Sequence, residues 1–118
     1  ASESAALRRV FGDALPAVSS TKGFTGHTTS ASGSIESVFC LLALQHRFIP
    51  QNLNWQTCDE ECIVPAHGML ADDASGSKEK SEGHDDSPVL NHVMCNGFGF
   101  GGNDSTVILG RFEQGKAL

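Results

Sequence analysis

The feature that most constrains this chain is an apolar segment near its middle, at residues 30–45. Its apolar residues are Ile35, Val38, Phe39, Cys40, Leu41, Leu42, Ala43 and Leu44. On a helix these side chains surround most of the circumference, and a helix of that kind is normally buried. The small residues at positions 28–34 allow its N-terminal end to pack closely against another backbone or a ligand. We therefore expect a layered α/β fold around one buried helix.

The flanking segments predict the remaining elements. Residues 2–11 are typical of a short helix, with Ser2 as its N-cap and Gly12 at its end. Residues 16–20 favour a brief strand, and a loop of small residues then leads to His27.

Two later segments, residues 89–96 and 105–112, have the composition of strands. The glycine-rich residues 97–104 between them return the chain, which predicts an antiparallel pair. The sheet expected from these strands is mixed and incomplete. Open strand edges and an apolar helix need cover from other structure, either an upstream half or a partner chain. We therefore expect the isolated chain to be poorly soluble or to oligomerise.

Charge and composition exclude several classes of protein. The 118 residues carry a formal charge of −6, most of it between residues 72 and 86. We treat residues 1–118 as one segment with a polar, acidic insertion at about 71–87. A nucleic-acid partner is not expected, because binding to phosphates requires a basic face. No apolar run approaches the roughly 20 residues that span a bilayer, and no secretory signal pattern is present, so a cytoplasmic location is expected.

The four cysteines predict reduced thiols. Cys40 and Cys95 lie in apolar surroundings, where a free thiol behaves as a small hydrophobic side chain. Cys58, Cys62 and His67 faintly imitate a zinc site, but a second closely spaced pair of ligands is missing. The alternative, a polar loop, is favoured. We expect no metal and no cofactor.

Three motifs follow one another in a specific order. Residues 19–27 read S-S-T-K-G-F-T-G-H, residues 28–36 form a helix start that includes Glu36, and residues 96–102 read N-G-F-G-F-G-G. Together they resemble the S-x-T-K-x-x-x-G-H motif, the small-residue helix and the N-S-F-G-F-G-G loop of the β-ketoacyl synthases. The resemblance spans nearly the whole chain except the acidic insertion. It implies the C-terminal portion of a thiolase-like layered fold.

The resemblance also implies a reaction, the decarboxylating Claisen condensation of an acyl thioester with malonyl-acyl-carrier-protein in fatty acid or polyketide-type elongation. It makes His27 the donor of a hydrogen bond to a thioester oxygen on which negative charge develops. Lys22 and Glu36 would form a supporting ion pair. The Phe100 N–H would contribute to an oxyanion hole, and its ring would gate the acyl pocket.

The same resemblance suggests where substrate is bound and what is missing. The expected substrate-binding residues are Thr21, Thr25, Phe98, Gly99 and Gly101. The nucleophilic cysteine and a second histidine would belong to a part of the enzyme that these 118 residues do not contain.

The resemblance also implies partners. The expected ones are an acyl carrier protein and the upstream half of the enzyme or a complementary chain, in a homo- or heterodimer. A carrier protein, being acidic, would dock on local cations such as Arg8, Arg9 and Arg47.

Other interpretations stay open at this point. A histidine before a helix is often only a cap or a surface residue, and Phe98 and Phe100 are also explained as core anchors. Ser30 and Ser32 replace a glycine and an alanine of the family pattern, and Asp104 replaces an asparagine. These departures support an alternative function, a non-catalytic partner subunit resembling a chain-length factor. We expect the Asp104 carboxylate to face away from His27.

Overall fold

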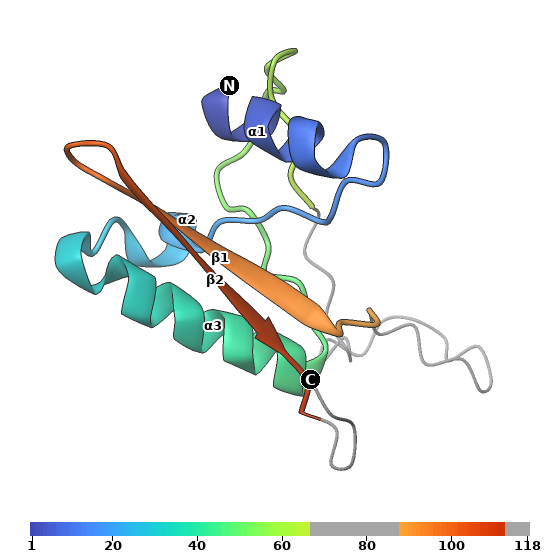
Figure 1. Ribbon diagram of the computed structural model, residues 1–118, viewed down its shortest axis with the longest axis vertical. Helices are drawn as coiled ribbons and strands as arrows, with labels where there is room; N and C mark the ends of the chain where they lie inside the picture. Colours follow the sequence, from blue (N-terminus) through green and yellow to red (C-terminus); the bar gives the residue numbers. More distant parts are fainter. Residues whose placement is uncertain (67–87, 113–118) are drawn as a thin grey trace.

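The computed structural model describes residues 1–66 and 88–112, so the predicted acidic insertion and His67 lie outside the described residues. The elements, in order, are α1 (Ser2–Phe11), α2 (Lys22–Thr25), a 3₁₀ turn (Thr29–Ala31), α3 (Ser32–His46), β1 (His92–Gly99) and β2 (Asn103–Gly110). Figure 1 shows the hairpin of β1 and β2 lying along α3, with α1 above them. This small α/β arrangement is compatible with the predicted fold class.

The hairpin confirms the predicted antiparallel pair but shifts its strands. The register runs from His92 opposite Gly110 to Gly99 opposite Asn103. The first strand therefore extends further along the chain than predicted, and the second begins earlier. The tight turn needs only two residues of positive φ, Gly101 and Gly102, so the strands continue right up to it.

The helix α3 is held at its C-terminal end by an arginine. It ends at His46, and the next residue, Arg47, adopts the left-handed conformation. The Arg111 guanidinium donates hydrogen bonds to the carbonyls of Leu44 on α3 and Leu90 before β1. A cation at the last carbonyls of a helix is electrostatically favourable. Arg111 therefore joins the end of α3 to the start of the hairpin.

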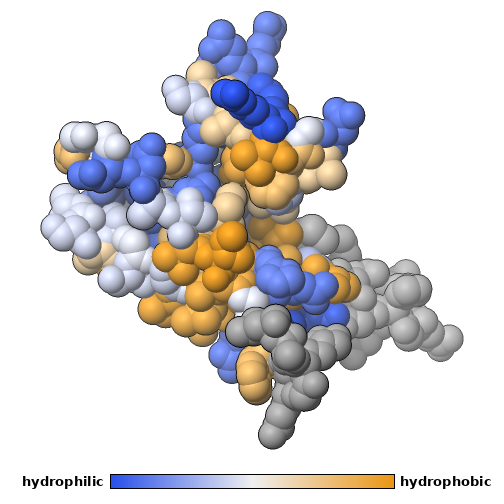
Figure 2. Space-filling view, in the orientation of Figure 1, coloured by the Kyte–Doolittle hydropathy of each residue, from blue (hydrophilic) through white to orange (hydrophobic). Residues whose placement is uncertain are grey.

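The prediction that α3 is buried on all sides is wrong within the described residues. Ala43 and Leu44 are buried, but Val38 and Leu41 are 54% and 52% exposed. Figure 2 shows apolar side chains gathered on the surface over α3 and the hairpin, and again on α1. The reason is geometric: the hairpin covers only one side of a helix that is apolar around most of its circumference.

Four further expectations need correction. Residues 16–20 form no strand, and the described strands are one antiparallel pair, so the sheet is not mixed. No second strand lies beside residues 16–20 in the described part of the chain to complete a ladder. Ser2 is the first residue of α1 and makes no capping hydrogen bond, although Gly12 ends the helix as predicted. The loop expected before His27 contains the one-turn helix α2.

A cavity of about 680 Å³ separates residues 16–22 from β1. Residues 92–96 all line it. Successive side chains of a strand point to opposite faces, so a run of five lining residues indicates that the cavity follows the free edge of β1. We call it the β1 groove. Within the described residues, no helix has the length and apolar character needed to cross a membrane.

The cysteines confirm the expectation of free thiols, since Cys40, Cys58, Cys62 and Cys95 all lack a disulfide. Burial, followed by the neighbouring Cys95 and then Glu36, raises the pKa of the Cys40 thiol from 9.0 to about 11. Cys40 therefore stays protonated at neutral pH and acts as a packing residue between α3 and β1.

The raised pKa of Cys40 predicts that its thiol is modified slowly by alkylating reagents. Because the folded-state pKa of Cys40 is raised, its contribution to stability is complete below pH 9.0 and is lost as the pH rises through about 11. Timed alkylation with iodoacetamide, followed by peptide mass spectrometry, should modify the exposed Cys58 well before Cys40 at neutral pH. Equal rates at the two cysteines would contradict the assignment.

The exposed face of α3 predicts self-association of the chain on its own. Val38 and Leu41 present apolar surface that water disfavours. Sedimentation velocity should show concentration-dependent association, and the double substitution Val38→Ser and Leu41→Ser should weaken it. Val10→Ser is the matched control, because Val10 is a more exposed apolar residue on another helix. A monodisperse monomer at all concentrations would rule out the prediction.

Candidate active site

His27 lies in a bend between two helices. Gly26 ends α2 with a φ of 67°, and the 3₁₀ turn begins two residues after the histidine. Thr29, the first residue of that turn, has a φ of 51°. Positive φ is rare for a β-branched residue and costs conformational energy. Such strain is a feature of functional sites, and here it directs a backbone N–H toward the histidine ring.

The hydrogen bond from that N–H indicates which nitrogen of His27 carries a proton. The Thr29 N–H donates to Nδ1 of His27 over 3.0 Å. A ring nitrogen that accepts a hydrogen bond has no proton of its own. The neutral ring therefore carries its proton on Nε2, and within the described residues Nε2 has no hydrogen-bond partner. The exposed His27 side chain is thus an available hydrogen-bond donor.

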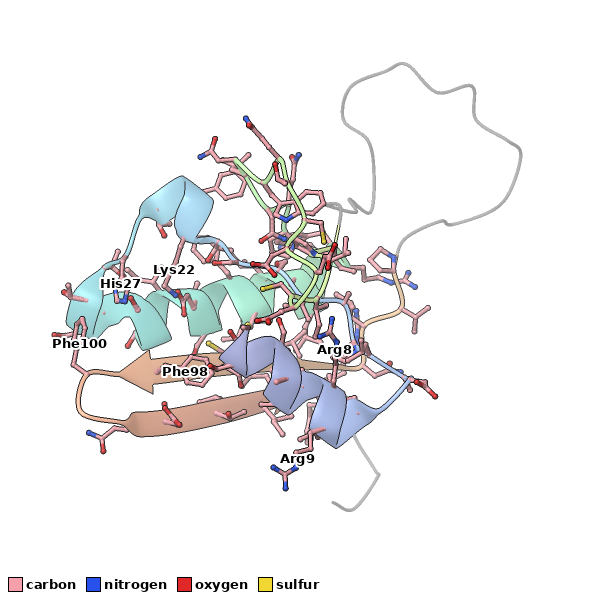
Figure 3. All side chains as sticks on the ribbon, turned by 90° about the horizontal axis from the view of Figure 1, so that it is seen from above. Arg8, Arg9, Lys22, His27, Phe98 and Phe100 are labelled. Atoms are coloured by element: carbon pink, nitrogen blue, oxygen red, sulfur yellow. The ribbon has the colours of Figure 1, made fainter. Side chains whose placement is uncertain are left out.

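The glycine-rich turn of the hairpin lies at the same end of the molecule as His27. Figure 3 shows His27 and Phe100 together at the end of the molecule where α3 begins, and Figure 1 shows the same arrangement of the turn and α3. Phe100 is fully exposed and Phe98 is partly exposed. No hydrogen bond joins Asp104 to His27 in the described part of the chain. The structure therefore brings the first and third sequence motifs to one end of the fold.

Lys22 and Glu36 form the predicted ion pair. Lys22 is the first residue of α2, and Glu36 lies in the early part of α3. The side chain of Glu36 is 17% exposed and that of Lys22 is 39% exposed. The pair therefore joins the two helices that flank His27.

The expected substrate-binding residues separate into two groups. Thr21 and Thr25 belong to the α2 segment, and the Thr25 hydroxyl donates to the backbone carbonyl of Gly26 over 2.9 Å. Phe98, Gly99 and Gly101 belong to the hairpin. Thr21 and Phe98 line the β1 groove, whereas the other three do not.

Sequence reasoning missed the residues that contact the histidine ring. The Thr29 N–H and the Ser32 hydroxyl both lie at Nδ1 of His27. The only sequence signal was the replacement of small family residues by serine. Nothing in the sequence indicates that a threonine adopts positive φ.

The Lys22–Glu36 pair predicts a measurable coupling. In a double-mutant cycle with Lys22→Met and Glu36→Gln, we expect a coupling free energy of about 1 kcal/mol or somewhat more. This coupling free energy is larger than that of most exposed ion pairs because Glu36 is largely buried. It is smaller than that of a fully buried pair because Lys22 is partly solvated. Urea unfolding of the four proteins measures it. Additive effects of the two substitutions would show that the pair is not a functional link between the helices.

Comparisons with known proteins identify related sequences. The family model described as "Beta-ketoacyl synthase, C-terminal domain" matches residues 1–56. The chain is 38% identical over 112 residues to "3-oxoacyl-[acyl-carrier-protein] synthase 1" of Escherichia coli strain K12. The matched region covers 95% of this chain and 24% of that protein. The protein of the same name from Haemophilus influenzae is 38% identical over 111 residues, covering 94% of this chain and 24% of the relative.

A relative with a different name extends the comparison. "Putative polyketide beta-ketoacyl synthase 1" of Streptomyces halstedii is 37% identical over 112 residues, covering 91% of this chain and 22% of the relative. The chain thus spans about a quarter of the length of these curated relatives. The matched motif around His27, the glycine-rich hairpin and these identities together assign the chain to the β-ketoacyl synthase family, as a C-terminal part of such a protein.

Proposed function

We propose that this chain supplies one catalytic histidine to a 3-oxoacyl-acyl-carrier-protein synthase. The observation that carries the proposal is the hydrogen bond from the Thr29 N–H to Nδ1 of His27, which leaves a proton on Nε2. A neutral imidazole with this tautomer is a hydrogen-bond donor for an oxygen that gains negative charge.

The proposed reaction develops such a charge. Decarboxylation of a malonyl thioester breaks the bond to the carboxylate carbon, releases CO₂ and leaves the electron pair as an enolate on the thioester oxygen. The enolate carbon then attacks an acyl thioester carried on a cysteine of the complete enzyme, and the cysteine thiolate leaves. Nε2–H of His27 stabilises the enolate oxygen in the first step. Lys22 and Glu36 keep α2 and α3 in the positions that orient the ring.

The hairpin turn has a second role in this proposal. The N–H of Phe100 would bind the oxygen of the acyl thioester as it becomes tetrahedral, and the exposed Phe100 ring would cover the acyl chain. Gly99 and Gly101 on either side would give the turn the freedom to open and close. Thr21, Thr25 and Phe98 would contact the substrate.

A working site also needs cover that this chain does not supply. His27 and Phe100 are exposed, whereas electrostatic stabilisation of an enolate is strongest where water is excluded. The β1 groove has the free edge of β1 as one wall and residues 16–22 as the other. We propose that strands from the remainder of the synthase fill this groove and pair with β1, either in the same polypeptide or in a complementary chain. The assembly would be a homo- or heterodimer.

The acyl carrier protein is the proposed macromolecular substrate. The Arg8 guanidinium already donates to the carbonyls of Glu61 and Cys62 over 2.9 and 3.1 Å, so Arg8 is a structural residue. Figure 3 shows Arg9 on the outward face of α1. Arg9 is therefore a better contact for an acidic carrier protein than its neighbour.

The substitution His27→Asn tests the catalytic role in the complete synthase. It removes the donor at Nε2, so turnover should fall about 10²- to 10³-fold. Transfer of the acyl group to the cysteine should continue, since it precedes decarboxylation. Release of labelled CO₂ from malonyl-acyl-carrier-protein measures the affected step directly.

His46→Asn is the matched control, because His46 is exposed at the opposite end of α3. It should retain the activity of the unmodified synthase. If His27→Asn also retains full decarboxylation, the catalytic assignment is wrong. If the unmodified synthase shows no condensation, the chain belongs to a non-catalytic partner subunit.

A further inference from the structure

The hydroxyl groups of Thr28 and Ser32 form a short relay that ends at the ring of His27. Ser32 Oγ lies 3.3 Å from Nδ1 of His27, and Thr28 Oγ1 lies 3.3 Å from Ser32 Oγ. Both hydroxyl residues are half-buried, whereas His27 is exposed. The relay therefore contacts the side of the ring that faces the protein.

The direction of this relay follows from the backbone hydrogen bond. Nδ1 accepts a hydrogen bond from the Thr29 N–H, so it presents a lone pair and carries no proton. In this tautomer the ring has no proton at Nδ1, so the Ser32 hydroxyl is the donor and shares the Nδ1 lone pair with the Thr29 N–H. Its oxygen is left free to accept a hydrogen bond from Thr28. The hydrogen bonds thus run from Thr28 to Ser32 to His27.

The two donors to Nδ1 come from different kinds of backbone. The Thr29 N–H belongs to a residue with a φ of 51°, which is an unfavourable conformation for threonine. Ser32 is the first residue of α3, a regular helix of 15 residues. A donor on a regular helix is a more rigid support for a functional side chain than one on an irregular turn.

We propose that Ser32, supported by Thr28, is a positioning residue that holds the His27 ring in the tautomer with its proton on Nε2. The catalytic consequence rests on the proposed function of His27. The tautomer itself is a property of the ring and is measured without turnover, so the two ideas are separable.

The test uses the complete synthase labelled with ¹⁵N-histidine and the substitution Ser32→Ala. Long-range ¹H–¹⁵N correlation spectra report the two ring nitrogens, and the signals of His27 are assigned by their loss in His27→Gln. In Ser32→Ala we expect a new population with the proton on Nδ1. We also expect kcat to fall about two- to tenfold with KM unchanged, because the loss of one hydrogen bond has an effect of this size on the rate.

Three further variants make the result specific. Ser32→Thr keeps the hydroxyl and should restore both the spectrum and kcat. Thr28→Val keeps the side-chain shape and should produce a smaller change of tautomer in the same direction. This variant also tests the proposal if Ser32→Ala does not fold. Ser30→Ala is the matched control, because Ser30 makes no side-chain hydrogen bond within the described residues. It should leave the spectrum unchanged.

The outcomes separate the two ideas. An unchanged His27 spectrum in Ser32→Ala overturns the proposal, even if kcat falls, because the effect would then be only structural. If Ser32→Ala does not fold, an unchanged spectrum in Thr28→Val overturns it instead. A changed spectrum with an unchanged rate of malonyl decarboxylation supports the role of Ser32 and overturns the catalytic role of His27.

The substitution Ser32→Ala leaves the cap of α3 unchanged. The N-cap residue of this helix is Ala31, which makes no side-chain capping hydrogen bond, so Ser32→Ala removes no cap.

Discussion

The packing of α3 against the β1–β2 hairpin is the interaction on which the rest of the structure depends. It buries Ala43 and Leu44 and leaves much of the same helix in contact with water. The N-terminal end of this helix then sets the position of His27, Ser32 and Glu36, and the hairpin sets the position of Phe100. One contact between two elements thus determines both halves of the candidate site.

The helices and strands were predictable from the sequence where the pattern of side chains is strong. The apolar run at residues 35–44 and the strand composition on either side of the glycine-rich turn correctly predicted α3 and the hairpin. Gly12 correctly marked the end of α1. The Lys22–Glu36 pair was predicted from a family resemblance, since residues 14 positions apart have no local reason to meet.

The remaining features depend on interactions that a pattern does not encode. The strand expected at residues 16–20 is absent, because a strand forms only beside a partner and the described residues provide none there. The exact ends of β1 and β2 depended on which glycines adopt positive φ. The contacts of Nδ1 in His27 depended on the unusual conformation of Thr29, which composition does not reveal.

The link that Arg111 makes between Leu44 and Leu90 has a consequence for where this chain can change in length. It joins the C-terminal end of α3 to the hairpin, and α3, a helix of 15 residues about 22 Å long, lies between that end and His27. The polypeptide between Arg47 and Asn91 enters and leaves the fold at that distant end. Residues added next to Arg47 or Asn91 would therefore lie a helix length away from the imidazole, whereas Asn52 and Leu53 pack against Ser20 and Gly23 in the α2 segment.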